Sequence, residues 1–388
     1  MKNKILIIST LLFCLTGCES YLDRQPDDQL TSENLFETRT SAFKCLVDVY
    51  SHMFFYAEAA NSTNGGIQLS GSDECSLPYP TANDKNQRFY VAWCHGSMSP
   101  MYSNNAYVDD TYYRFYRGIT NATYFMKNVQ RCLELTDEEI SIWTAEARFC
   151  RAIFYHDMMR YYGPVVFTGE DVTDFNDPDL DTRDRSTWSS LVSWLCSELD
   201  KAAANLPDSW GAADLGRATR GAALGLKARL LVMNARPLFN GQGGTHLYDN
   251  LINKNGEHLF NINYDQNRWK EAADACKDVI DLNIYNLEKE ASLSPIENYH
   301  NVFKKKTSKE HIFVQMTRIN LRQQTSPRGI GSGGRGGVAL TQKMVDAFAC
   351  DNGKYPIVNW GEDDYNNGLN IRIDQNTGYD EKASATVW

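Results

Sequence analysis

Three charged residues, Glu146, Arg148 and Arg151, lie inside an aromatic run that ends abruptly at Gly163-Pro164. A carboxylate next to two guanidinium groups could carry acid–base chemistry, so these residues are a candidate catalytic set. The run, TAEARFCRAIFYHDMMRYYGPVVF over residues 144–167, has its apolar residues at helical spacing. Charges on an amphipathic helix more often form salt bridges or contacts with helix ends. We therefore interpret the set as scaffold and predict no catalytic residue.

Long amphipathic helices separated by long irregular segments are the elements that must position any site. Apolar residues recur at steps of three and four, which predicts helices over residues 41–56, 109–133, 137–162, 187–206, 217–235, 267–282 and, shorter, 341–349. Thr136 and Glu139 form a capping box before the third helix, and Gly163-Pro164 ends it. The best strand-like stretches are residues 165–167 and 311–316.

The predicted helices follow one another in pairs, the first with the second, the third with the fourth and the fifth with the sixth. Paired helices with small residues at their contacts favour tetratricopeptide-like stacking, in which each pair buries its apolar face on the next. The expected fold is therefore mainly α, a tetratricopeptide-like helix-pair scaffold with long irregular loops. The seventh helix has no partner before Trp388, so we expect an incomplete fourth pair.

The N-terminus has the pattern of an export signal. Lys2 and Lys4 precede an apolar stretch over residues 5–15, and Leu15-Thr16-Gly17-Cys18 resembles the lipobox of bacterial lipoproteins. On this interpretation residues 1–17 are removed, Cys18 is acylated, and residues 18–388 form a single domain. Acyl chains anchor a protein through roughly 0.8 kcal/mol per buried methylene. The alternative is an ordinary secretory signal with a chance cysteine; no later segment is apolar enough to span a membrane.

Charge and cysteine usage exclude several classes of partner. The formal net charge of −10 argues against a nucleic-acid partner. Cysteines stand singly in helix-patterned segments, where we predict buried small apolar residues, at Cys45, Cys132, Cys150, Cys196, Cys276 and Cys350. Cys75 and Cys94 flank one loop and could pair or remain free. The sequence has no zinc-like Cys/His spacing, and GEDDYNNG over residues 361–368 lacks EF-hand spacing, so we expect neither metal nor cofactor.

Several stretches then carry a family resemblance. YLDRQP stands shortly after Cys18. Four more stretches come after it in order: the run 144–167, LGRATRGAALGLKARLLVMNARPLFNG over 215–241, RWKEAADACKDVI over 268–280 and TQKMVDAFACDNG over 341–353. Together they resemble SusD/RagB-family lipoproteins over nearly the whole chain, and the family's 144–167 counterpart belongs to its helical scaffold. Family members are usually much longer than 388 residues, so the resemblance implies a chain truncated at its C-terminus.

The resemblance also implies a function and partners. SusD-like proteins are outer-membrane lipoproteins at the cell surface that bind oligosaccharides or other nutrients. They cover a SusC-like TonB-dependent transporter and are not enzymes. One alternative is a lipid-anchored polysaccharide-degrading enzyme, which would need two carboxylates roughly 5 to 9.5 Å apart. Another is a helical-repeat adaptor that binds only protein.

The loop over residues 69–109 has side chains suited to a sugar. Aromatic faces stack on pyranose rings, whereas Asn, Asp and Arg bond to hydroxyls, and loops on a rigid scaffold carry such groups. We predict Trp93 as the platform and, as further contacts, Tyr79, Tyr90, Asp73, Arg88 and Asn104. Alternatively, Phe89, Tyr90 and Trp93 pin the loop to the helices. A second loop, residues 240–264, offers Tyr248.

Overall fold

The computed structural model describes residues 34–53, 72–76, 106–174, 176–179, 182–316, 339–341, 343–344 and 347. Its helices are α3 (Arg39–Ser51), α6 (Ala106–Asn128), α7 (Asp137–Tyr162), α8 (Trp188–Ala203), α9 (Arg220–Ala235), α10 (Asn267–Asp281) and α11 (Pro295–Lys304). Short 3-10 turns lie at Val129–Arg131, Ala212–Asp214 and Gly241–Gly244. Two short strands, β1 (Cys75–Ser76) and β2 (Ala339–Leu340), pair antiparallel, with Cys75 opposite Leu340.

Capping residues explain where the helices begin. α7 has the predicted bounds, because the Thr136 hydroxyl accepts a hydrogen bond from the Glu139 amide at 3.2 Å and the Glu139 carboxylate accepts one from the Thr136 amide at 3.0 Å. Gly163 ends this helix at a φ of 68°, a region that favours glycine. α9 starts three residues later than predicted because the Thr219 side chain caps it.

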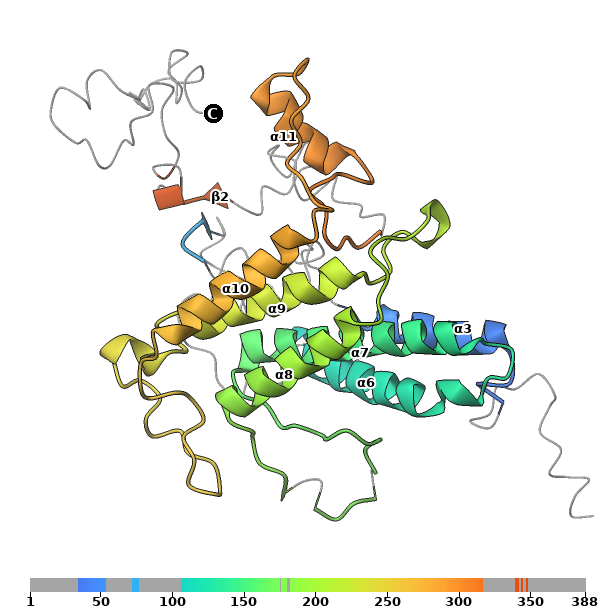
Figure 1. The fold of residues 1–388 in the computed structure, drawn as a ribbon. Coiled ribbons are helices and arrows are strands. Elements are labelled where there is room, and N and C mark those ends of the chain that lie inside the picture. Colours follow the sequence, from blue (N-terminus) through green and yellow to red (C-terminus); the bar gives the residue numbers. More distant parts are fainter. Residues whose placement is uncertain are drawn as a thin grey trace, which may run out of the picture.

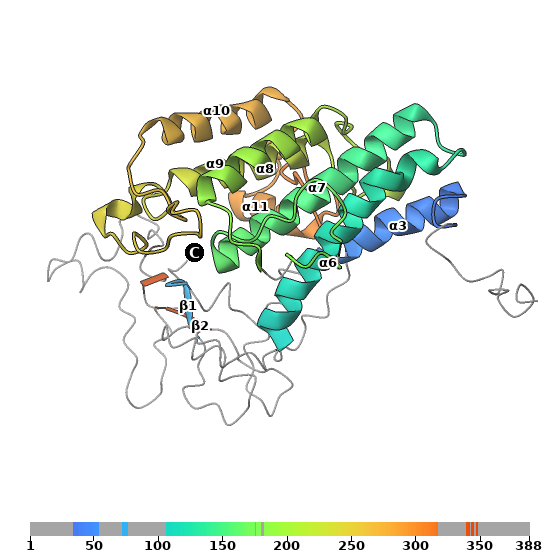
Figure 2. The ribbon, with the colours of Figure 1, turned by 90° about the horizontal axis from the view of Figure 1, so that it is seen from below.

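The helices form one continuous stack in chain order. Figure 2 shows α3, α6, α7, α8, α9 and α10 following one another across the molecule, and each packs on its neighbour. The predicted pairs are all in contact, which confirms the mainly α, helix-stacking fold. α6 nevertheless packs more extensively on α7 than on α3, so the stack does not divide cleanly into the pairs that we expected. α11 stands to one side of it (Figure 1).

Small and aromatic residues let the helices approach closely. Phe115 of α6 and Phe154 of α7 are fully buried with ring centroids 6.1 Å apart. A Cβ at Gly118 would lie 2.5 Å from the Phe154 ring, so this contact requires glycine. In α9, alanine fills the contacts with α8 and α10, where Ala222, Ala223, Ala228 and Ala235 are all buried. The core therefore extends through the whole stack.

The charged residues of α7 lie in this core and join the helices. Glu146 is fully buried; its carboxylate accepts hydrogen bonds from Arg217 at 2.5 and 3.0 Å and from the Tyr50 hydroxyl of α3 at 2.7 Å. Burial raises the pKa of the Glu146 carboxyl, and the bonds from Arg217 and Tyr50 oppose that rise. Glu146 thus ties α3 and the residues before α9 to α7.

A second buried carboxylate, Glu198 of α8, binds the other two predicted residues. Arg148 donates to it at 2.6 Å and Arg151 at 2.5 Å. Arg151 also donates to Glu170 at 2.8 Å and is only 1% exposed. The prediction that these charges form salt bridges within a scaffold is confirmed. These charged side chains are buried more deeply than charges on the polar face of an amphipathic helix usually are.

Two strand predictions are wrong. Residues 165–167 form no strand, because their carbonyls bond to helices and a turn: Val166 accepts from the Tyr116 hydroxyl at 2.8 Å and Val165 from the Ser186 amide at 3.0 Å. Residues 311–316 form no strand either. Their apolar side chains pack on helices instead, as in the contact of Phe313 with Phe149 at 5.1 Å between ring centroids.

The cysteine prediction holds in part. Cys132 and Cys150 are buried, Cys45 and Cys196 are half-buried, and all are free thiols. Cys276 is exposed, so its prediction is wrong. α10 buries only Ala272 and Ala275, which leaves Cys276 on its outer face.

Cys18, Cys94, Cys350 and most of the predicted helix 341–349 lie outside the described residues, as does the signal segment. None of the helices within the described ranges is long and apolar enough to cross a membrane.

Candidate functional site

Most of the predicted ligand contacts fall outside the part of the chain that the structure describes, namely Trp93, Arg88, Asn104, Tyr79 and Tyr90. Asp73 is described and exposed beside β1, and its carboxylate pairs with Lys343. The hydrogen bond from Lys343 lowers the pKa of Asp73. These contacts place the start of the predicted ligand loop next to residues 339–344.

Tyr248 lies in a different part of the fold, between α9 and α10. Its ring is half-buried and stacks on Phe260 with centroids 4.5 Å apart. Its amide donates to the Gln242 side chain at 2.6 Å. Phe260 therefore covers one face of the ring and leaves at most the other face for a ligand. The described structure records no contact between Tyr248 and Asp73.

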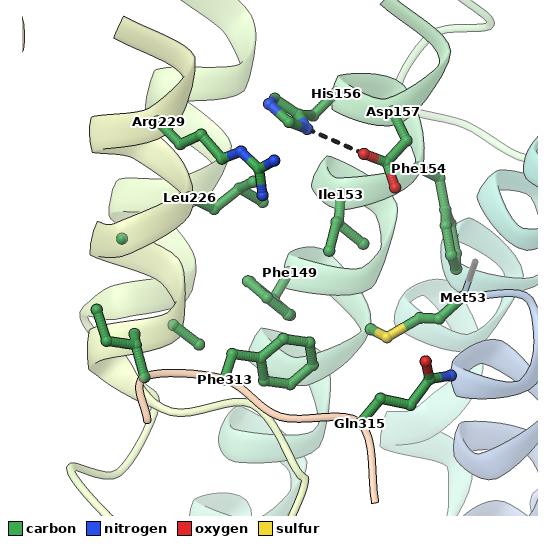
Figure 3. A pocket seen from close by; sticks show the side chains of 13 residues that line it. Met53, Phe149, Ile153, Phe154, His156, Asp157, Leu226, Arg229, Phe313 and Gln315 are labelled. Atoms are coloured by element: carbon green, nitrogen blue, oxygen red, sulfur yellow. Dashed lines mark hydrogen bonds and ion pairs between the residues drawn. The ribbon is translucent and has the colours of Figure 1, made fainter. Parts of the chain in front are cut away.

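Two cavities that the sequence did not predict lie on either side of residues 311–316. We call the first the histidine cavity. It has a volume of about 350 Å³ and is lined by residues of α7 and α9, by Met53, and by Ile312, Phe313 and Gln315 (Figure 3). Its floor is apolar, with Phe149, Ile153 and Leu226 at helical spacing on the facing helices. Gly225 lets Ile312 come close, since a Cβ there would lie 3.3 Å from that side chain.

Polar groups gather at one end of the histidine cavity. Figure 3 shows His156 and Asp157 on α7 facing Arg229 on α9. His156 is 1% exposed, and its Nδ1 lies 3.2 Å from the Asp157 carboxylate. An ionised carboxylate only accepts hydrogen bonds, so Nδ1 is the donor. The His156 Nε2 is buried and has no hydrogen-bond partner within the described part of the chain.

We call the second space the tryptophan cavity. It has a volume of about 300 Å³ and is lined by residues before α9, by Tyr285 and by residues 306–316. Trp210 is fixed in its wall: the indole N–H donates to the Ala218 carbonyl at 2.7 Å, and the Arg217 guanidinium lies 3.9 Å from the ring centroid. Such a cation–π contact stabilises by about 0.5 to 2 kcal/mol. Ile312 and Phe313 line both cavities, so the two spaces are adjacent.

A hydrogen-bonded turn forms the outer wall of the tryptophan cavity. The Glu288 carboxylate accepts bonds from Lys305 at 2.9 Å and from the Ser308 hydroxyl at 2.8 Å. The bond from Lys305, followed by that from Ser308, lowers the pKa of Glu288 to about 2. His311 closes the turn, with Nε2 2.7 Å from the Val302 carbonyl and Nδ1 accepting from the Ser308 amide. This turn presents Lys306 and Lys309 to the cavity.

The chemistry of both cavities is that of binding. Apolar and aromatic walls with a few polar and cationic groups suit a ligand that is held by stacking, hydrogen bonds and charge. Across the described ranges, no group of three or more His, Cys, Asp or Glu side chains is arranged to hold a metal ion. One sequence signal pointed to this region, namely the basic run KKKTSK over residues 304–309. Its folding beside Trp210 could not be seen in the sequence.

The described helices form a stack of the helical-repeat class, and comparison with known proteins gives the family. A model of SusD-like proteins, described as starch-binding and associating with the outer membrane, matches residues 20–232, more than half of the chain. The chain therefore belongs to the SusD-like family.

Individual relatives agree with this assignment. A SusD-like protein of Formosa agariphila is 23% identical over 236 residues, which cover 59% of this chain and 42% of its own length. A SusD-like protein of Bacteroides ovatus is 25% identical over 249 residues, which cover 63% and 41%. The chain thus spans about two fifths of the length of these curated relatives.

Solved structures agree on the fold. A SusD-like protein from Bacteroides fragilis aligns with a TM-score of 0.62 at 22% identity, over 86% of this chain and 56% of its own. A SusD-like carbohydrate binding protein from the same species aligns with a TM-score of 0.61 at 18% identity, over 90% and 60%. At these identities the likeness concerns the fold alone.

Proposed function

We propose that this protein is a cell-surface lipoprotein that captures a glycan or another nutrient and delivers it to a SusC-like TonB-dependent transporter. The observation that carries the proposal is the match of residues 20–232 to a family described as starch-binding and associated with the outer membrane. The lipobox-like residues before Cys18 support a lipid anchor, with residues 1–17 as the signal and one domain following.

Capture in this proposal is physical. Aromatic stacking and several weak hydrogen bonds hold the glycan, and moderate affinity lets the protein pass it on. The stack of helices provides a rigid support, and the ligand groups stand on the segments between helices. Trp93 is the proposed platform of the 69–109 loop, with Tyr79, Tyr90, Asp73, Arg88 and Asn104 around it and Tyr248 as a more distant candidate.

The first test is a glycan-array and affinity-gel screen of the chain that starts after Cys18. We expect binding to one class of polysaccharide and no cleavage products. Released oligosaccharides would contradict the proposal and favour a polysaccharide-degrading enzyme. An absence of binding to every glycan would contradict glycan capture.

Trp93→Ala should weaken glycan binding by roughly 1 to 3 kcal/mol, the loss usual for one buried aromatic contact, while the helical circular dichroism stays unchanged. Loss of helicity would show that Trp93 is a core residue. Trp269→Ala, which changes an exposed tryptophan on α10, serves as the control.

Cys18→Ala should abolish membrane anchoring, because the acyl chains would have no attachment point. Fractionation of cells that express the full chain measures this. Membrane association that persists in the variant would show that another segment or a partner holds the protein.

A further inference from the structure

Three cations line the two cavities without a partner. Arg229 lies in the histidine cavity, and Lys306 and Lys309 lie in the tryptophan cavity. All three residues are exposed. Within the described part of the chain, none of their side chains forms an ion pair or a hydrogen bond.

The acidic residues of the same linings are already neutralised. Asp157 lies 3.4 Å from the Arg160 guanidinium, and Asp208 lies 3.3 Å from that of Arg220. The fourth lining cation, Arg217, is itself balanced by acidic neighbours, of which Asp214 lies 2.8 Å away. Lys306 and Lys309 in the tryptophan cavity and Arg229 in the histidine cavity are therefore the lining cations that, within the described chain, remain free to pair with a ligand.

Other groups in the linings suit a sugar. Trp210 and Tyr285 are half-buried and give the tryptophan cavity aromatic surface. Thr307 adds an exposed hydroxyl between the two lysines. In the adjacent histidine cavity, His156 lies close to Arg229 (Figure 3). Ile312 and Phe313 line both cavities, so the two sets of groups belong to adjacent spaces.

From these observations we infer that the ligand is an acidic oligosaccharide, whose carboxylate or sulfate groups bind Lys306 and Lys309 on one side of residues 311–316 and Arg229 on the other. The inference rests on the proposed function of glycan capture and narrows its ligand class. Arg229 suits a carboxylate or sulfate because its planar guanidinium can donate two parallel hydrogen bonds, whereas the lysines act as mobile point charges.

The test uses calorimetric titration of the whole chain after Cys18 with four probes. Tetragalacturonate and a sulfated heparin tetrasaccharide are acidic, and maltotetraose and cellotetraose are neutral. We expect an acidic probe to bind more tightly than either neutral one. Its affinity should fall as NaCl rises from 20 to about 150 mM, since salt screens exposed charges.

Variants then assign the binding to the cavities. The double variant Lys306→Gln/Lys309→Gln should lower the affinity for the acidic probe about ten-fold. Each exposed charge pair that is lost contributes a factor of about two to five. Arg229→Gln should lower the affinity for the acidic probe several-fold. The control, Lys270→Gln with Lys277→Gln, removes the same charge from the exposed face of α10 and should change nothing. All of these side chains are exposed, so circular dichroism should be that of the parent.

Two results would overturn the inference in distinguishable ways. Binding of neutral probes alone, or acidic binding that responds equally to the cavity and control variants, would refute the acidic ligand and leave glycan capture standing. Binding of none of the four probes, together with a glycan array without any hit, would refute glycan capture and the inference with it.

Discussion

Replacement of Glu198 by glutamine removes one negative charge from the interior of the helical stack. The Glu198 side chain is fully buried and accepts bonds from Arg148 at 2.6 Å, Arg151 at 2.5 Å and Lys201 at 3.2 Å. Glutamine has almost the same shape, so the change tests charge rather than packing. Arg151, which is 1% exposed, then remains in the core with Glu170 as its acidic partner.

The size of the effect follows from burial. Removal of one member of a buried ion pair usually destabilises a protein by about 3 to 5 kcal/mol. Glu170 stays 2.8 Å from Arg151, but its side chain is 50% exposed, so water already screens part of its charge. It therefore offsets only part of the loss, and we expect about 3 kcal/mol. In a domain of this size that corresponds to a fall in Tm of about 4 °C.

Urea unfolding followed by circular dichroism measures the change. Asp274→Asn is the matched control, because it breaks the Lys270–Asp274 pair, whose side chains are 75% and 63% exposed, and should cost at most about 0.5 kcal/mol. The double variant Arg151→Met/Glu198→Leu removes both buried charges and should regain part of the loss. A Glu198→Gln variant as stable as Asp274→Asn would refute the reasoning, since the pair would then be effectively solvated.

Two further predictions concern the walls of the tryptophan cavity. The pKa of Glu288 is lowered from 4.5 to about 2, so its carboxylate stabilises the 305–311 turn above pH 4.5, and that stability should be lost as pH falls from about 4.5 to 2. Hydrogen exchange of residues 305–311 should show this loss, and Glu288→Gln should abolish the pH dependence; identical profiles in the two proteins would contradict the assignment. Gly221→Ala should destabilise the protein by about 1 to 3 kcal/mol, because its methyl group would overlap the Tyr285 hydroxyl. In a Tyr285→Leu background, Gly221→Ala should lower the free energy of unfolding much less. A double-mutant cycle in which Gly221→Ala lowers it equally in both backgrounds would rule out the clash.

The sequence predicted the helices well where their ends are set locally. Thr136, Glu139 and Gly163 act within a few residues of one another, so the bounds of α7 could be found from the sequence. α11 has an equally local signal, a capping box of Ser294 and Glu297 with Pro295 between them, but no long apolar face accompanies it because the helix is short and buries no residue. Local chemistry therefore predicts helix ends more reliably than hydrophobic periodicity does.

Partners across the stack could not be predicted in the same way. Helical periodicity indicates which face a residue is on, but Glu146 and Arg217 are 71 positions apart and Arg151 and Glu198 are 47 apart. Their pairing depends on how the helices pack. The same reason applies to residues 311–316, for which the sequence predicted a strand. No neighbouring strand exists there within the described ranges, so these side chains fill space beside α7 and α9 instead.

The tryptophan cavity was not predicted. The predicted ligand contacts are on the 69–109 loop and at Tyr248, and they stay predictions. The residues of the cavity come from three segments far apart in the sequence, around positions 210, 285 and 306–316, and only the basic run 304–309 was visible beforehand. Asp73 and Tyr248, the predicted contacts that the structure describes, line neither cavity and remain predictions.

Scaffold and site share one buried pair, and this decides which variants can test binding. Arg217 donates to the buried Glu146 and at the same time stacks on Trp210 in the cavity wall. Any change at Arg217 would leave Glu146 as an uncompensated buried charge, so lost binding could not be separated from lost stability. Lys306 and Lys309 have no such second role, since they are exposed and unpaired within the described chain. Loss of acidic-glycan affinity in these lysine variants, at unchanged stability, would therefore report on the ligand contact alone.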